Sequence, residues 1–127
     1  MIVGQVDARR HSVVSLVVIG PTGQQETILF QVDTCFNGSL MLPAAQIAAL
    51  GLPQVEELSI RLADGSRIGA WQYLAHVEWD GQVRQTRVVA SGSQPLLGMS
   101  LALGYNISIN MVDGGRVALT RLPSSAP

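Results

Sequence analysis

The amino-acid sequence predicts an all-β fold, on the strength of three observations. Apolar residues recur mostly at every second position, the spacing that places alternate side chains on one face of a strand. Turn signals such as Asp80-Gly81 separate these runs, and few segments have the features of a helix. The chain has 127 residues, 47% of them hydrophobic and 13% charged, so one compact domain over residues 1–122 is expected.

The strands expected first along the chain form a hairpin that leads into Asp33. Its two runs are dense in apolar residues, and Pro21-Thr22-Gly23 lies between them as a turn. The later strands alternate more strictly between apolar and polar residues, which predicts strands with one buried face. In chain order, the expected strands cover residues 2–7, 13–19, 27–32, 58–62, 71–79, 83–90, 105–111 and 117–122.

Turn dipeptides support the later hairpins. Asp80-Gly81 is the pair best suited to a tight hairpin, because both of its positions tolerate a positive φ. Asp64-Gly65 is a second signal of this kind, and Asp113-Gly114-Gly115 is a third. Each of these turns is expected to connect neighbouring strands.

Helical structure is expected mainly over residues 43–50. Pro43 suits the first helical position, and Gly51 stands just past the end, where a left-handed residue is favoured. A further turn of helix is expected between Met99 and Leu103, closed by Gly104. Residues 123–127 are expected to form a flexible C-terminal tail.

Composition excludes several classes of function. Net charge is −1, and the eight basic residues are scattered arginines, so neither nucleic acid nor a membrane surface is an expected partner. A single cysteine cannot form an intrachain disulfide, and His11 and His76 suggest no metal cluster, so no metal or organic cofactor is expected. The first residues lack the layout of a secretion signal, and a cytoplasmic, free-standing gene product is expected.

Asp33 stands directly after a buried apolar run, an unusual place for a carboxylate. Burying a carboxylate alone is costly, so Asp33 must be hydrogen-bonded, paired or protonated. The simpler interpretation is a turn-capping aspartate that accepts a backbone N–H two residues further on. A catalytic interpretation requires a second feature, and the run Leu96-Leu97-Gly98 provides one.

Taken together, these segments resemble the retroviral-type (retropepsin-like) aspartic peptidases, and most closely their free-standing prokaryotic members. The resemblance rests on Asp33-Thr34-Cys35-Phe36-Asn37-Gly38, on the following Leu42-Pro43, and on Leu96-Leu97-Gly98 about sixty residues later. It extends over about residues 12–121 and implies a closed acid-protease barrel with a flap hairpin and one or two short helices. It also implies an aspartic-type endopeptidase.

The resemblance implies a role for each matching residue. Asp33 is the expected catalytic aspartate, and the Thr34 hydroxyl is expected to brace the catalytic loop of a partner chain. Leu96, Leu97 and Gly98 are expected to pass behind this loop and to help bind substrate. The flap tip is expected at Leu62, Ala63, Asp64, Gly65 and Ser66, above the substrate.

The resemblance has one departure, because Cys35 occupies the position where the family has glycine. A negative φ at Cys35 would carry little penalty, whereas a left-handed φ would cost about 1 kcal/mol. An alternative function is therefore a catalytically weakened or silent dimer of the same fold that binds peptide or protein. A further hypothesis is that Cys35 acts as a redox switch beside the catalytic pair.

Peptide hydrolysis of this type needs two carboxylates that share one proton, and hence two chains. The ionised carboxylate takes a proton from water and the other protonates the carbonyl oxygen, as in aspartic proteases generally. Only one Asp-Thr-x segment is present, so a homodimer and a bell-shaped, acidic pH profile are expected. Strands 2–7 and 117–122 are expected to pair either across the dimer or within one sheet.

Two other enzyme classes match the sequence less well. Gly98-Met99-Ser100-Leu101-Ala102 misses the serine-hydrolase elbow by one residue, and no α/β alternation surrounds it. Cys35 and His76 would supply a thiol nucleophile and a base, but a lone cysteine and a lone strand histidine are more often packing residues.

Overall fold

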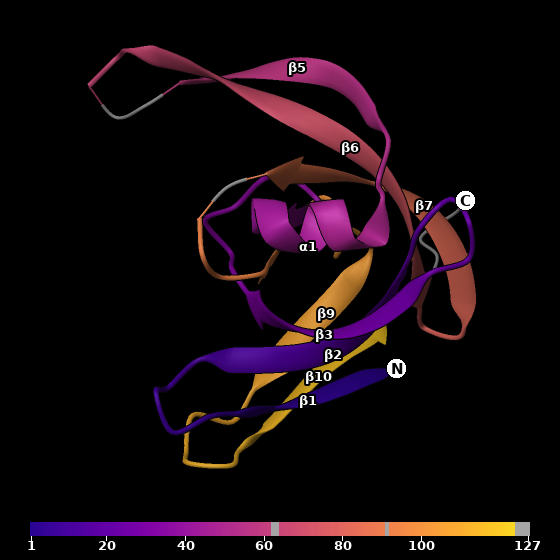
Figure 1. Ribbon diagram of the computed structural model, residues 1–127. Coiled ribbons are helices and arrows are strands. Elements are labelled where there is room, and N and C mark those ends of the chain that lie inside the picture. The colour runs from indigo at the N-terminus through magenta and orange to yellow at the C-terminus, as the bar shows by residue number, and fades with distance from the viewer. Residues whose placement is uncertain (62–63, 91, 124–127) are drawn as a thin grey trace.

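The computed structural model describes residues 1–61, 64–90 and 92–123, and in these ranges the chain is mostly β-sheet with one helix (Figure 1). The all-β prediction is confirmed at this level. The elements are β1 (Ile2–Val6), β2 (Ser12–Ile19), β3 (Gln25–Val32), β4 (Leu40–Leu42), α1 (Ala44–Leu50), β5 (Gln54–Arg61), β6 (Arg67–Trp79), β7 (Gln82–Ala90), β8 (Leu96–Leu97), β9 (Tyr105–Ile109) and β10 (Arg116–Arg121).

The strands form one sheet in the order β5-β6-β7-β4-β8-β3-β2-β1-β10-β9. Neighbours are antiparallel except for β3–β8 and β4–β7, which are parallel. An additional antiparallel pairing joins β2 to β6 at Val18↔Val77 and Ile19↔His76. This extra pairing bends the sheet back on itself, and α1 lies between the β5–β6 hairpin and the strands β2 and β3 (Figure 1).

Two predicted hairpins are confirmed with their turns. β2 pairs with β3 over seven residues on each strand, and Gly23 in the connecting turn has a φ of 87°. β6 pairs with β7 up to Trp79↔Gln82, and the turn residues Asp80 and Gly81 have φ values of 52° and 84°. Positive φ at both central positions matches the twist of the flanking strands, which explains why Asp-Gly occurs here.

The predicted helix is confirmed as α1, which follows Pro43 and ends at Gly51. Gly51 adopts the left-handed conformation with φ 64°, and its N–H donates to the Ala48 carbonyl at 3.1 Å. Between Met99 and Leu103, where a further turn of helix is expected, the chain forms hydrogen-bonded turns with one helical bond, from the Ala102 N–H to the Gly98 carbonyl at 3.4 Å, and does not extend into a helix. Leu101 and Ala102 are buried, so their apolar character reflects core packing.

The terminal strands pair within one chain. β1 lies between β2 and β10, and β10 lies between β1 and β9. The within-sheet arrangement, one of the two expected, is the one found, although β1 pairs with β2 only at Gln5 and Val6. Pairing of these strands across a dimer stays a prediction. In the part of the chain that the structure describes, β5 and β9 form the edges of the sheet.

One contiguous hydrophobic core supports the sheet. Phe30 of β3, Leu40 and Leu42 of β4 and Leu97 of β8 are all fully buried in it. These strands flank the loop that carries Asp33, so the loop rests on densely packed side chains. Within the described ranges, the structure has no helix of the length and apolar character needed to span a bilayer.

Candidate active site

The Asp33 loop crosses over strand β8. Residues Gln31 and Val32 of β3 pair in parallel with Leu96 and Leu97, while Leu40 of β4 pairs antiparallel with Leu97. The short strand β8 therefore lies between β3 and β4. The chain leaves β3 on one side of β8 and returns as β4 on the other, and residues 33–39 connect the two sides.

Asp33 is held at the start of this loop by three backbone interactions. Its N–H donates to the Leu97 carbonyl at 2.9 Å, and its own carbonyl accepts the Phe36 N–H at 3.2 Å. The Oδ1 atom of Asp33 accepts the Cys35 N–H at 2.9 Å. This last bond is the turn-capping contact of the simpler interpretation. Asp33 is half-buried, and among the described hydrogen bonds none occupies its second carboxylate oxygen.

The loop is locked to the segment that follows β8. Gly98 N–H donates to the Ser39 carbonyl at 2.8 Å, and Met99 N–H donates to the Phe36 carbonyl at 2.8 Å. Ser100 donates twice, from its N–H to the Gly38 carbonyl at 3.1 Å and from its hydroxyl to the Asn37 carbonyl. The Asp33 loop therefore cannot move independently of the Leu-Leu-Gly segment.

Gly98 is required by close approach of the two segments. A Cβ at this position would lie 2.6 Å from Phe36 Cδ2 and closer still to the Gly38 carbonyl oxygen. Both distances are shorter than real Cβ contacts, and the nearer atom belongs to the backbone. Glycine is thus the residue that allows β8 to pass directly beneath the loop.

Cys35 sits in the loop without backbone strain. In the described ranges, the non-glycine residues with positive φ are Arg10 and Asp80. Cys35 therefore has no left-handed φ, and the cysteine carries little conformational penalty. Its thiol is free and the residue is exposed. The consequence of having cysteine here therefore depends on what its side chain meets, and not on the conformation of the loop.

Thr34 is exposed beside Asp33. Among the side-chain hydrogen bonds of residues 1–61, 64–90 and 92–123, none involves its hydroxyl. The expected bracing of a partner's loop stays a prediction, because it concerns a second chain.

The β5–β6 hairpin projects from the rest of the chain (Figure 1). Near its tip the Asp64 carboxylate accepts the Ser66 N–H at 2.9 Å and the Ser66 hydroxyl at 2.5 Å, and Gly65 has a φ of 87°. The Ser66 hydroxyl is the main reason that the pKa of Asp64 is lowered. Leu62 and Ala63, the first two residues of the expected flap tip, lie outside the described residues.

The two leucines of β8 differ in exposure. Leu97 is fully buried, and Gly98 is buried as well, so neither offers a side chain to a bound peptide. The expected direct substrate contact of these two residues is corrected to a supporting position under the loop. Leu96 remains half-buried and keeps part of its surface.

The competing catalytic arrangements gain no support. His76 pairs with Ile19, which lies opposite Gln25 at the start of β3. The Asp33 loop, with Cys35, begins at the other end of β3, roughly 25 Å away along the strand. The Ser100 hydroxyl is engaged by the Asn37 carbonyl. Within the described ranges, no group of three or more His, Cys, Asp or Glu side chains is arranged to hold a metal ion.

Sequence reasoning missed Ser39 and Ser100, which connect the loop to the segment after β8. Ser39 contributes only a carbonyl, so its side chain carries no signal. A serine two residues after Gly98 places a hydroxyl donor beside the Leu-Leu-Gly run, and this donor is the signal that could have indicated the bond to the loop.

The strand order and the passage of β8 beneath the Asp33 loop define a mostly β, retropepsin-like fold. A solved structure of the EIAV protease complexed with the inhibitor HBY-793 is similar to this chain, with a TM-score of 0.53 and 13% sequence identity. The match covers 74% of this chain and 86% of the EIAV protease chain. At this identity the likeness concerns the fold alone. No family model and no curated protein matches the sequence.

Proposed function

We propose that this chain is an aspartic endopeptidase that acts as a homodimer, with Asp33 of each chain as the catalytic pair. The observation that carries the proposal is the state of the Asp33 carboxylate. One oxygen is fixed by the Cys35 N–H, and the described residues leave the other without a hydrogen bond. The half-buried carboxylate is thus oriented and accessible in a fold similar to that of a retroviral protease.

The proposed chemistry follows from two such carboxylates in close contact. Like charges at hydrogen-bond distance cannot both ionise, so the pair shares one proton. The ionised carboxylate removes a proton from the attacking water, while the protonated one donates to the carbonyl oxygen of the scissile peptide bond. Each chain supplies a single Asp-Thr-x segment, so a two-fold axis beside the Asp33 loops completes the site.

The proposed substrate is an extended peptide bound between the Asp33 loop and the flap hairpin. An extended chain can add to a sheet edge through its backbone, and β5 provides such an edge. Asp64, Gly65 and Ser66 would contact the peptide from above, and the exposed part of Leu96 would contact it from below. The proposal includes the closed barrel, which the β2–β6 pairing supports, and requires no cofactor.

The edge of β9 is the proposed seam between the two chains. Asn110 N–H donates to the Arg116 carbonyl of β10 at 2.9 Å. Because backbone groups alternate between the two sides of an antiparallel strand, those of Ile107 and Ile109 face away from β10. With β1 and β10 both flanked inside the chain, β9 offers unpaired groups that a second copy can satisfy.

The dimer is tested by mixing chains. We expect the Asp33→Asn protein to exchange with wild type and to form pairs that hold one carboxylate. A tenfold excess should then reduce the hydrolysis of a peptide library by the wild-type chains by about tenfold, because few wild-type pairs remain. An equal excess of an Asp33→Asn protein that also carries Ile107→Pro, which removes a β9 edge N–H, should suppress less. Activity that is insensitive to the first variant would contradict the shared site.

Cys35 supports a second candidate function, the silent peptide-binding dimer. The exposed thiol lies beside the catalytic carboxylate, where the family has glycine. We expect Cys35→Gly to change kcat/KM for peptides by less than about tenfold. A variant that gains several orders of magnitude over an inert wild type would establish the second function for the natural chain. The Cys35→Ser protein, which retains the volume without the thiol, separates crowding from thiol chemistry.

A further inference from the structure

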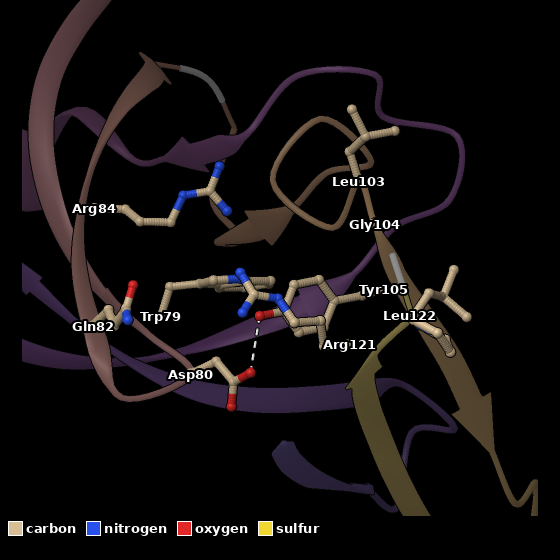
Figure 2. A pocket seen from close by; sticks show the side chains of 10 residues that line it. Trp79, Asp80, Gln82, Arg84, Leu103, Gly104, Tyr105, Arg121 and Leu122 are labelled. Carbon is tan, nitrogen blue, oxygen red and sulfur yellow. Dashed lines mark hydrogen bonds between the residues drawn. The ribbon is translucent and has the colours of Figure 1, made fainter. Parts of the chain in front are cut away.

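A groove of about 890 Å³ opens at the turn between β6 and β7 (Figure 2), and no residue of the Asp33 loop, 33–39, lines it. The start of β9 and the end of β10 form its other wall. β6 has 13 residues, so the groove is separated from the flap turn by roughly 40 Å along that strand. Its lining residues are Trp79, Asp80, Gln82, Arg84, Leu103, Gly104, Tyr105, Arg121, Leu122 and Pro123.

Two arginines enter the groove from opposite walls, Arg84 from β7 and Arg121 from β10 (Figure 2). Among the described residues, neither guanidinium forms an ion pair with a carboxylate. The acid in the groove, Asp80, is already engaged: its Oδ2 accepts the Tyr105 hydroxyl at 2.9 Å, and its Oδ1 contacts the Met1 ammonium group. Arg121 is close enough to Asp80 to help lower the pKa of that carboxyl, but neither arginine is held in a direct ion pair, so both guanidinium groups keep N–H donors for a ligand.

Trp79 lines the groove with a buried indole ring. Trp79 is 3% exposed. Among the buried side-chain nitrogen and oxygen atoms of the described residues, its Nε1 is the one without a hydrogen-bond partner. The indole packs edge-on against Tyr105, with ring centroids 5.4 Å apart. Its N–H lies toward the Tyr105 hydroxyl without reaching hydrogen-bond geometry. Because this N–H is buried and directed at the Tyr105 oxygen, the donors that a ligand in the groove can reach are those of the exposed side chains Arg84, Arg121 and Gln82.

We propose that this groove binds an organic oxyanion, a carboxylate or a phosphate monoester with an apolar body, at a site separate from the Asp33 loop. Guanidinium groups bind both oxyanions through paired N–H donors. Leu103 is 82% exposed and Leu122 is 49% exposed at the rim, and they offer apolar surface to the rest of the ligand. The groove volume is in the range of small-molecule sites.

The test uses the fluorescence of Trp79. The chain has two tryptophans, so a Trp71→Phe background leaves Trp79 as the reporter. Phenyl phosphate and 3-phenylpropionate are titrated as probes, with inorganic phosphate as the probe without an apolar body. We expect saturable binding of at least one aryl probe, tighter than inorganic phosphate by at least about tenfold. The tighter aryl probe identifies phosphate or carboxylate as the preferred group.

Charge variants assign the binding to this groove. Arg84→Gln and Arg121→Gln should each weaken the aryl probe by about tenfold or more. Arg9→Gln removes the same charge from the exposed β1–β2 turn outside the groove and should change binding by less than twofold. Failure of every probe to saturate, or equal weakening by Arg9→Gln, would overturn the proposal. Neither result depends on peptide hydrolysis, so the proposed endopeptidase function is tested separately.

Discussion

Asp33 and Asp80 are two aspartates of one sheet with opposite surroundings. Asp33 follows β3 and receives one local bond, from the Cys35 N–H, to a single oxygen. Asp80 joins β6 to β7 and has both oxygens engaged, by Tyr105 and by the Met1 ammonium group. These two partners, the ammonium group first, hold the pKa of Asp80 below its usual value.

The difference separates a carboxylate that stabilises the fold from one that is available for chemistry. The partners of Asp80 lie 25 and 79 positions away in the sequence, so its bonds tie distant segments together. The bonds of the Asp33 loop instead connect backbone to backbone across β8 and leave one carboxylate oxygen free within the described structure. The loop is held by its backbone bonds while its acid remains uncommitted, as the catalytic role proposed for Asp33 requires.

The comparison predicts its largest effect on activity. Asp33→Asn should lower kcat/KM for peptide hydrolysis by at least about 100-fold, because the variant can no longer exchange a proton with water. The asparagine side-chain oxygen still accepts the Cys35 N–H, so the unfolding midpoint should stay close to that of wild type. Asp113→Asn makes the same charge change in the exposed β9–β10 turn and should leave the rate unchanged. Comparable losses of kcat/KM in both variants would mean that the effect comes from removing a negative charge and not from a specific role of Asp33.

The next effect concerns the rigidity of the Asp33 loop. Gly98→Ala should lower the free energy of unfolding by about 3 kcal/mol, because the new methyl group meets Phe36 and the Gly38 backbone. Gly23→Ala is the control, since its Cβ would meet nothing within 4 Å and only the positive φ of 87° opposes it. That cost is about 1 kcal/mol. Urea denaturation checks both values. Equal losses of unfolding free energy in the two variants would show that β8 shifts away from the loop to accommodate the new methyl group.

Local chemistry explains which parts of the fold could be predicted. The β6–β7 hairpin follows from Asp80-Gly81, and the end of α1 follows from Gly51, because each signal acts within a few residues. The three-residue strand β4 has no such signal. It exists because Leu40–Leu42 pairs in parallel with β7 and antiparallel with β8, and both partners are distant in sequence. The sequence likewise did not decide which strands pair with β1 and β10, because their partners are also distant in sequence.

The candidate site divides in the same way. Asp33 was predicted from its position after a buried run, and the turn-capping bond to Cys35 involves a residue two positions away. The burial of Leu97 was not predicted, because it depends on strands that flank β8 on both sides. The oxyanion groove was not predicted either: Arg84 and Arg121 come from different strands and share no motif.

The smallest effect concerns how Asp80 responds to pH. Its pKa is lowered on folding, so the unfolded chain binds a proton at higher pH than the folded chain does. The stability contributed by Asp80 is therefore present above the unfolded pKa of about 3.9 and is lost as pH falls through the folded value. We expect Asp80→Asn to lower the unfolding midpoint at pH 7, and the difference from wild type to shrink below about pH 4.

Asp64→Asn provides the comparison within the flap. The pKa of Asp64 is also lowered, but by Ser66 two residues away, so the bond ties no distant segments together. Its effect on the unfolding midpoint at pH 7 should be smaller than that of Asp80→Asn, and thermal unfolding at pH 3, 5 and 7 measures both. A difference between Asp80→Asn and wild type that persists undiminished at pH 3 would show that the bonds of Asp80 act without its charge. Asp80 would then act as Asp33 does towards the Cys35 N–H, as a hydrogen-bond acceptor whose contribution does not require a charge.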